Sequence, residues 1–130
     1  MDILSTVLAN IKGASKPKNP IDGINLLPFL TDKNKNSPHD FLYWRMFNKN
    51  SYAVINKDEK KMVILKDSSF LYDLKKEINE KTNIMDSEKM VSEEINAAKA
   101  KWEKGMINPI FLGLGQEEEY RKLKGIIIKK

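Results

Sequence analysis

The stretch FLYWRMF, residues 41–47, decides the fold class of this chain, because here the sequence changes to short runs rich in β-forming residues. Three similar runs follow at residues 51–55, 62–66 and 70–74, and polar segments separate them. Runs of this length and spacing predict a meander of four antiparallel strands. The turn at residues 56–60 contains no Gly, so we expect a longer hairpin loop there.

A helix is predicted after the strands. Either Asp86 or Ser87 can cap its start, and it should end near Gly105. Charged residues occupy its other sides, while its apolar face has helical spacing and consists of Val91, Ile95, Ala98 and Trp102. One face of the predicted sheet is the nearest apolar surface, so we expect the helix to pack there and the fold to be α+β.

The residues before the sheet predict a short helix and a linker. Residues 2–12 have an amphipathic pattern that Gly13 ends, with an apolar stripe of Leu4, Val7, Leu8 and Ile11. Residues 15–20 contain two prolines and favour an extended connection. Asp22-Gly23 predicts a turn, after which one or two helical turns should end near Thr31.

The composition limits the class of protein. A chain of 130 residues is long enough for one domain with one modest core. Its net charge of +5 rests on Lys, because only Arg45 and Arg121 among the 23 basic residues are Arg. Lysines spread along a chain are typical of a solvated surface, and base-edge recognition favours Arg, so we expect no nucleic-acid partner.

The sequence predicts no membrane span, because no apolar run approaches about 20 residues. It contains no Cys, which excludes disulfides, thiol nucleophiles and thiolate metal sites and leaves the cellular compartment open. The start, Met1-Asp2, lacks the basic and apolar regions of a signal peptide.

His39 is the single histidine and therefore the first candidate for acid–base chemistry. Its neighbour Asp40 could orient it, but adjacent residues of an extended segment point to opposite faces, which favours a role in a turn or in packing. The Asp and Glu residues match no calcium-loop or zinc pattern, so we expect no catalytic group and no metal site.

Aromatic residues and one Arg form a second candidate site. Tyr43, Trp44, Tyr52 and Tyr72 could stack on the apolar face of a sugar ring, or could be ordinary cross-strand pairs. The planar guanidinium of Arg45 suits a pair of sulfate or carboxylate oxygens, and the alternative is a surface ion pair with a cross-strand carboxylate. Both interpretations stay open at this point.

Three blocks of the sequence carry a resemblance: DGINLLPFLT at 22–31, PHDFLYWR at 38–45 and FLYDL at 70–74. In this order and spacing they resemble the C-terminal part of the sulfatases of the alkaline-phosphatase-like superfamily. MDILSTVL at 1–8 is similar to a helix near the end of the family's catalytic domain, with Ser5 in place of its usual Pro. The strands YAVI at 52–55 and MVI at 62–64, and TNI at 82–84, stand where the family has comparable stretches.

The resemblance implies a C-terminal subdomain that borders the substrate pocket of a sulfuric ester hydrolase and is not catalytic alone. It divides the chain into the end of a catalytic-domain-like helix with a connector (1–31), the subdomain (32–116) and a charged tail (117–130). The family's oxidised nucleophile, a formylglycine, lies in a Cys/Ser-x-Pro-x-Arg signature, which is absent here, and its calcium positions have no counterpart. The parent family is often exported.

The resemblance also implies which partners to expect. The substrate-binding candidates are His39, Tyr43, Trp44 and Arg45, toward a sulfated sugar. A catalytic sulfatase domain is the expected protein partner, with self-association through the N-terminal helix as an alternative. A free-standing module for sulfated sugars and a protein-interaction subunit are the two other classes of function that we consider.

Overall fold

The computed structural model describes residues 1–15 and 17–109. The chain is divided into two compact units, residues 1–40 and the part from Phe41 onward, and each is described by itself. The hydrophobic core lies in the second unit. The division of the chain predicted at residue 31 stays a prediction, and the charged tail lies outside the described residues.

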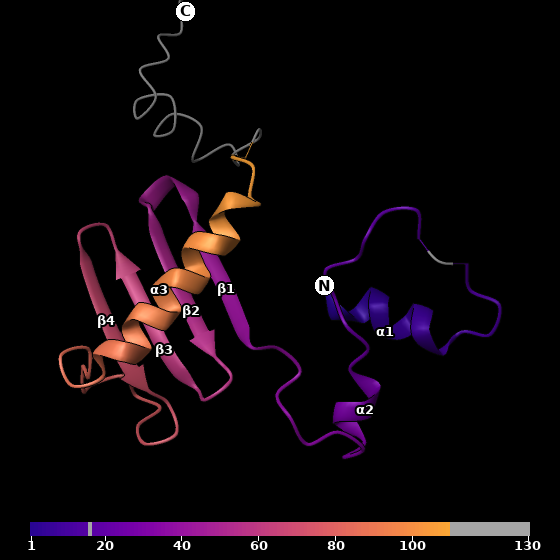
Figure 1. Cartoon of the computed structure of the whole chain (residues 1–130), viewed down its shortest axis with the longest axis horizontal. Helices are drawn as coiled ribbons and strands as arrows, with labels where there is room; N and C mark the ends of the chain where they lie inside the picture. The colour runs from indigo at the N-terminus through magenta and orange to yellow at the C-terminus, as the bar shows by residue number, and fades with distance from the viewer. Residues whose placement is uncertain (16, 110–130) are drawn as a thin grey trace, which may run out of the picture. The chain divides into compact units, whose positions relative to one another are not determined.

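The second unit contains the predicted four-stranded antiparallel sheet (Figure 1). Its strands are β1 (Phe41–Met46), β2 (Ser51–Asn56), β3 (Lys60–Leu65) and β4 (Ser68–Asp73), and they neighbour one another in sequence order. Each begins and ends within two residues of its predicted bounds. The sequence pattern locates them well because β-branched and aromatic residues fill the strands and polar residues fill the connections.

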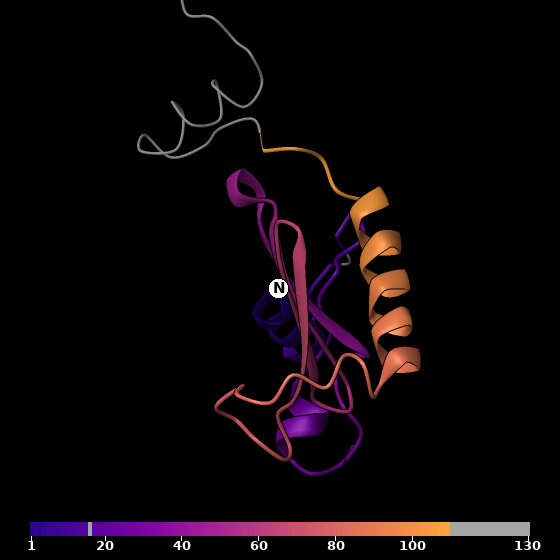
Figure 2. The same ribbon diagram turned by 90° about the vertical axis from the view of Figure 1, so that its left-hand side faces the viewer.

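The helix α3 (Lys89–Lys104) packs on one face of this sheet, as predicted (Figure 2). We call the face under α3 the inner face and the opposite one the outer face. The fully buried core consists of one residue from each of β2, β3, β4 and α3, namely Val54, Met62, Leu71 and Ile95. The alternation of side chains along each strand therefore brings one apolar set to the helix.

The start of α3 differs from the prediction that Asp86 or Ser87 caps it. The helix begins at Lys89, and its N-cap is Glu88, which makes no side-chain capping bond. The Ser87 hydroxyl donates instead to the carbonyl oxygen of Ile84, and the two oxygens are 3.0 Å apart. Ser87 lies one residue before the N-cap, so its hydroxyl is outside the position from which a side chain binds the free N–H groups of the first turn.

Left-handed residues that are not Gly shape the connections between strands. Residues 57–59 join β2 to β3, and Glu59 has a φ of 62°. Asn56 is buried, and its side-chain carbonyl oxygen accepts hydrogen bonds from the N–H groups of Asp58 and Lys60. This is the longer hairpin loop that the absence of Gly predicted. A short 3₁₀ turn η1 (Phe47–Lys49) and Asn50 at φ 47° join β1 to β2.

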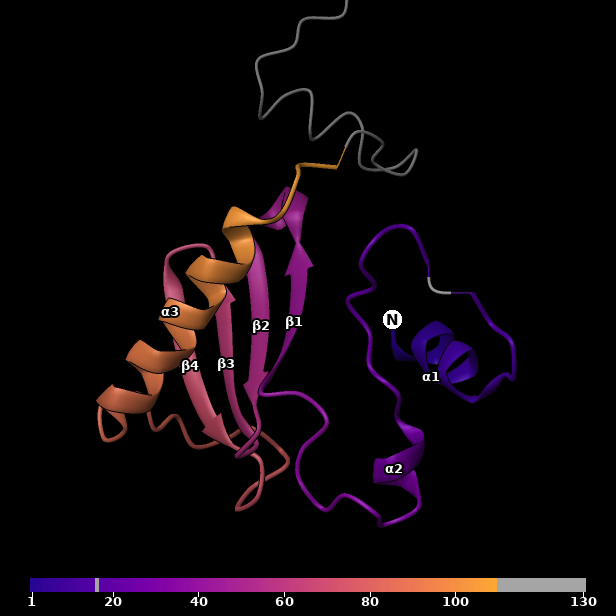
Figure 3. The ribbon, with the colours of Figure 1, turned by 45° about the vertical axis from the view of Figure 1, so that its right-hand side comes forward.

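The first unit contains α1 (Asp2–Asn10) and the single-turn α2 (Leu27–Leu30) (Figure 3). α1 ends two residues before the predicted position, and Gly13 follows it at φ 80°. Polar side chains at every fourth position fix α1 to the segment 24–27. Asp2 accepts from the N–H of Ile24, and Thr6 accepts from the N–H of Leu26.

The predicted apolar stripe of α1 is largely open. Leu4, Val7 and Ile11 are exposed, and no residue of α1 is buried. An open hollow of about 750 Å³ lies between this side of α1 and residues 17–23. Gly23 lies so close to the start of α1 that an added Cβ would be 2.5 Å from the carbonyl oxygen of Met1. The predicted turn residue is thus required by a close approach.

Candidate functional site

The four predicted binding residues are divided by the structure. Tyr43 and Arg45 project from the inner face of β1, because they are two positions apart, while Trp44 lies between them on the outer face. His39 belongs to the first unit. Only Tyr43 and Arg45 therefore share a surface of the sheet.

Tyr43 is part of the packing between the sheet and α3. Its ring stacks on that of Trp102, with centroids 4.9 Å apart and planes 5° from parallel. Phe41 lies beside Tyr43 on the same face, with a centroid separation of 6.1 Å. One face of the Tyr43 ring is thus occupied by α3, and Trp102 holds the place that a sugar ring would take there.

Arg45 lies near the end of β1, and its guanidinium contacts Asn108 and Phe47 and makes a hydrogen bond with Tyr52. One terminal nitrogen, Nη2, donates to Oδ1 of Asn108 at 3.2 Å, and the guanidinium carbon lies 4.6 Å from the centroid of the Phe47 ring. Its Nε is shielded from solvent and has no hydrogen-bond partner within residues 1–15 and 17–109. In the same part of the chain, Arg45 forms no ion pair, so the predicted surface pair with a carboxylate is not made there.

Arg45 and the charged and polar side chains near it form a group that we call the Arg45 corner. It consists of Arg45, Tyr52, Lys99, Glu103 and Asn108. Tyr52 is directly opposite Arg45 in the register of β1 and β2. The Lys99 ammonium lies 3.9 Å from the centroid of the Tyr52 ring and 2.7 Å from Oε2 of Glu103. The corner thus combines two cations, one carboxylate and a phenol.

The protonation of the Arg45 corner follows from these contacts. Burial raises the pKa of Tyr52, and its hydrogen bond with Glu103 raises it further. Hydrogen bonds from Lys99 and then from Tyr52 lower the pKa of Glu103, against the opposing effect of burial. Glu103 is therefore a carboxylate and Tyr52 a neutral phenol at neutral pH.

His39 pairs with Asp2, a residue that the sequence analysis did not connect with it. Nε2 of His39 and Oδ2 of Asp2 are 2.9 Å apart, and both side chains are partly buried. This hydrogen bond, followed by the one from the N–H of Ile24, lowers the pKa of Asp2. The pair joins the start of α1 to the end of the first unit, which gives His39 a structural role there.

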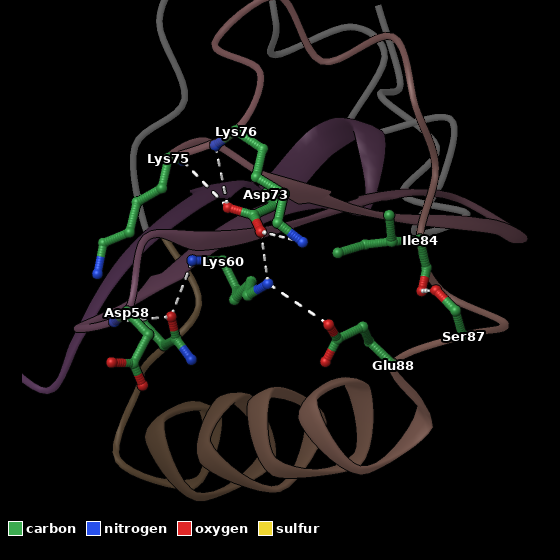
Figure 4. A network of polar contacts seen from close by, with 9 residues as sticks. Asp58, Lys60, Asp73, Lys75, Lys76, Ile84, Ser87 and Glu88 are labelled. Atoms are coloured by element: carbon green, nitrogen blue, oxygen red, sulfur yellow. Dashed lines mark hydrogen bonds and ion pairs between the residues drawn. The ribbon is translucent and has the colours of Figure 1, made fainter.

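The Lys60–Asp73 network is a second polar cluster, at the opposite end of the sheet (Figure 4). Nζ of Lys60 lies 2.7 Å from Oδ2 of Asp73 and 3.6 Å from Oε1 of Glu88. The hydrogen bond between Lys60 and Asp73 lowers the pKa of Asp73 and raises that of Lys60. Each buried charge has partners, so the network fastens β3 and β4 to the N-cap of α3.

Within the described ranges, no group of three or more His, Cys, Asp and Glu side chains is arranged to hold a metal. The same ranges contain no helix that is long and apolar enough to cross a bilayer.

Neither a family model nor a curated protein matches this sequence. A solved structure with a similar fold is the crystal structure of Ps i-CgsB, a carrageenan sulfatase, in complex with k-i-k-neocarrahexaose. The two align with a TM-score of 0.75 and 19% sequence identity over 96% of this chain. The similarity is one of fold. This chain spans 28% of the length of that solved chain.

Sequence reasoning found Arg45 and missed most of its surroundings. Lys99 and Glu103 are four positions apart, a spacing that indicates contact on a helix, but nothing in the sequence places that contact above Tyr52. A predicted register between the first two strands would have placed Tyr52 opposite Arg45, where the structure has it. Asn108 follows α3, where periodicity gives no signal.

Proposed function

We propose that this chain is the C-terminal subdomain of a sulfatase, a sulfuric ester hydrolase, and borders the substrate pocket when it is combined with a catalytic portion. The observation that carries this proposal is the fold: nearly all of this chain aligns with just over a quarter of a carrageenan sulfatase. The three sequence blocks that resemble the C-terminal part of sulfatases support it independently.

The isolated chain should not hydrolyse sulfate esters. Sulfuryl transfer requires an activated nucleophile and a group that stabilises the transferring charge. The sequence has no Cys, and none of its prolines is followed two positions later by Arg, so the formylglycine signature is missing. Formylglycine and calcium belong, in this proposal, to the catalytic portion.

Incubation of the purified chain with a generic aryl sulfate tests this proposal. We expect no turnover above a buffer blank from the chain alone, and turnover from a preparation that also contains the catalytic portion. Turnover by the chain alone that survives purification and is lost on chelation would contradict the proposal.

A second candidate function is the binding of a sulfated sugar at the Arg45 corner. It is favoured by the shielded Nε of Arg45, a donor without a partner in the described residues. A sulfate oxygen that displaced Asn108 from Nη2 would receive charge-assisted hydrogen bonds from the same guanidinium. Lys99 adds positive charge, while Glu103 limits the affinity for an anion.

NMR titration with a sulfated monosaccharide and its desulfated analogue tests this second function. We expect shifts at Arg45 and Tyr52 with the sulfated sugar alone. Arg45→Ala should lose about 1.5–3 kcal/mol of binding if a charged hydrogen bond is made. Shifts of equal size with both sugars, or none near Arg45, would leave these residues with a structural role. Shifts at Trp44 would point to the outer face instead.

A further inference from the structure

The two edges of the sheet differ in how their backbone groups are satisfied. The connection to α3 covers β4, because the N–H of Leu71 donates to Oδ1 of Asn83 at 3.0 Å and the N–H of Ile84 donates to the Leu71 carbonyl oxygen at 2.8 Å. β1 lies at the other edge, and β2 is its one neighbouring strand in the described residues (Figure 1). The edge at β4 is therefore closed by a segment of the chain itself.

The strand register shows which residues of β1 direct their backbone groups to the free edge. In an antiparallel pair, a residue either exchanges both backbone bonds with the residue opposite or directs both groups to the other side. Leu71 directs its groups away from β3, so by alternation across the ladders Val54 of β2 is bonded to β3. Tyr43, opposite Val54, therefore directs its groups to the free edge, as do Phe41 and Arg45 two positions away. Among the described residues, the groups of Phe41 and Arg45 have no backbone partner there.

β1 also lacks the features by which proteins prevent pairing at an edge. Exposed edges are usually protected by Pro, Lys, a bulge or a covering segment. β1 is a regular strand with the sequence FLYWRM, and Arg45 is its one charged residue. On the outer face, Leu42 and Trp44 are 44% and 51% exposed. These apolar side chains favour a partner strand that is apolar as well.

We propose that β1 pairs along this edge with β1 of a second copy of the chain, antiparallel and with Tyr43 of the two copies opposite each other. This inference is independent of the proposed function. In this register, Phe41 of each copy lies opposite Arg45 of the other. The three outward residues of one copy thus face the three outward residues of the other, and each facing pair exchanges both of its backbone bonds.

The side chains of β1 favour this partner and this register. The Arg45 guanidinium meets the ring of Phe41 of the second copy, whereas a register centred on Arg45 would place two like charges opposite each other, which is destabilising. On the outer face, Leu42 lies opposite Trp44 of the second copy, at a non-hydrogen-bonded position where facing side chains are closest. An apolar strand whose single charge lies away from its centre is therefore complementary to itself.

Sedimentation equilibrium of the full chain is the first test, and we expect a monomer–dimer equilibrium. Arg45→Pro removes an outward N–H from each copy and leaves the ladder with β2 intact, so it should raise the dissociation constant of the dimer by about tenfold or more. Arg45→Ala is the matched control, because it removes the same side chain and keeps the N–H. A chain that is monomeric at the concentration of an NMR sample, or a dimer that both variants weaken equally, would overturn the proposal.

The second test is cross-linking, which reports the register and does not depend on the proline variant. The chain contains no Cys, so each substitution introduces the only thiol of its chain. A mixture of Leu42→Cys and Trp44→Cys chains should form a disulfide dimer faster than either variant alone, since the two positions face each other across the pair. Ile78→Cys measures random collision, because Ile78 is 79% exposed and lies outside the sheet.

The same experiment separates edge pairing from contact between two outer faces. Leu65 lies on the outer face of β3 and is 51% exposed, and we expect Leu65→Cys to cross-link no faster than Ile78→Cys. Faster cross-linking of Leu65→Cys would assign the contact to the outer face. Faster cross-linking of Trp44→Cys alone than of the mixture would assign a different register. Either result would overturn the proposal.

Discussion

Asp73 is a buried carboxylate that accepts hydrogen bonds from the Lys60 ammonium and from the N–H groups of Lys75 and Lys76. These contacts favour its charged form, and its pKa lies below the ordinary value of 3.8. A carboxyl group whose pKa is lowered on folding stabilises the folded state fully above its unfolded pKa. That contribution is lost as the pH falls from 3.8 through the folded-state pKa.

We therefore predict that Asp73→Asn lowers the thermal midpoint by several degrees at pH 7 and by less at pH 3. At pH 7 the variant leaves the Lys60 ammonium, whose side chain is 16% exposed, with the distant Glu88 carboxylate as its remaining anion. Thermal denaturation followed by circular dichroism between pH 3 and pH 7 measures the difference.

The matched control for Asp73→Asn is Asp67→Asn, at an exposed turn between β3 and β4. This control should leave the thermal midpoint at pH 7 nearly unchanged, because substitutions at exposed positions change stability little. Parallel curves for Asp73→Asn and the original chain across this pH range would show that the Lys60–Asp73 hydrogen bond contributes nothing to stability. Part of the acid dependence should remain in any case, because the pKa values of Asp2 and Glu103 are also lowered.

At the scale of single elements, α1 has little to hold it. It contributes no buried residue, and it is fixed to the segment 24–27 by backbone N–H groups that donate to the Asp2 carboxylate and the Thr6 hydroxyl. A helix of nine residues is shorter than the about 12–15 at which isolated helices become marginal in water. Its order therefore depends on these few polar contacts.

We predict weak protection from hydrogen exchange at residues 4–11, compared with residues 62–65 of β3 and 91–102 of α3. Gly23→Ala should weaken it further, because the added Cβ would meet the backbone of Met1 and the Ser5 hydroxyl. Native-state exchange read by NMR or mass spectrometry measures both. Strong and equal protection of all three segments in a demonstrated monomer would mean that α1 is stabilised by a contact beyond those described.

The sequence predicted the elements of the second unit better than their ends. The apolar spacing from Val91 to Trp102 fixed the face of α3 that meets the sheet, since helical periodicity is a direct consequence of burial. It did not fix the start, because the helix begins at Lys89, two residues after Ser87, whose hydroxyl donates to the carbonyl oxygen of Ile84 in the preceding turn. The residue at which the helix begins depends on this preceding loop, which has no periodicity.

Candidate site residues were harder to place than elements. Alternation along β1 separates Trp44 from Tyr43 and Arg45, and this follows from the sequence. The partner of His39 does not follow, since Asp2 is 37 positions away and no pattern connects the two. In α1, polar residues face the rest of the first unit and the apolar stripe stays open, the reverse of the expectation from amphipathicity.

At the scale of the whole molecule, the core belongs to the second unit alone. Val54, Met62, Leu71 and Ile95 all lie after residue 40. We predict that a chain starting at Phe41 folds independently and unfolds with a free energy within about 0.5 kcal/mol of the full chain, as changes distant from a core do. Urea denaturation of both chains makes the comparison.

Met62→Ala in both chains is the control for that comparison, because it removes a fully buried side chain and should cost about 2–5 kcal/mol in each. A chain from Phe41 that fails to unfold cooperatively, or that loses several kcal/mol, would show that the first unit contributes to the stability of the sheet.

The order β1-β2-β3-β4 has a consequence for synthesis on the ribosome. Neighbouring strands are also neighbours in sequence, so each hairpin can close as soon as its second strand has emerged. The helix α3 is completed later. Between the end of β4 at Asp73 and the end of α3 at Lys104, the ribosome adds 31 residues (104 minus 73). At 5–20 residues per second, this takes about 2–6 s. Throughout that interval the nascent sheet exposes both apolar faces, and the yield of folded protein depends on how fast translation reaches the end of α3.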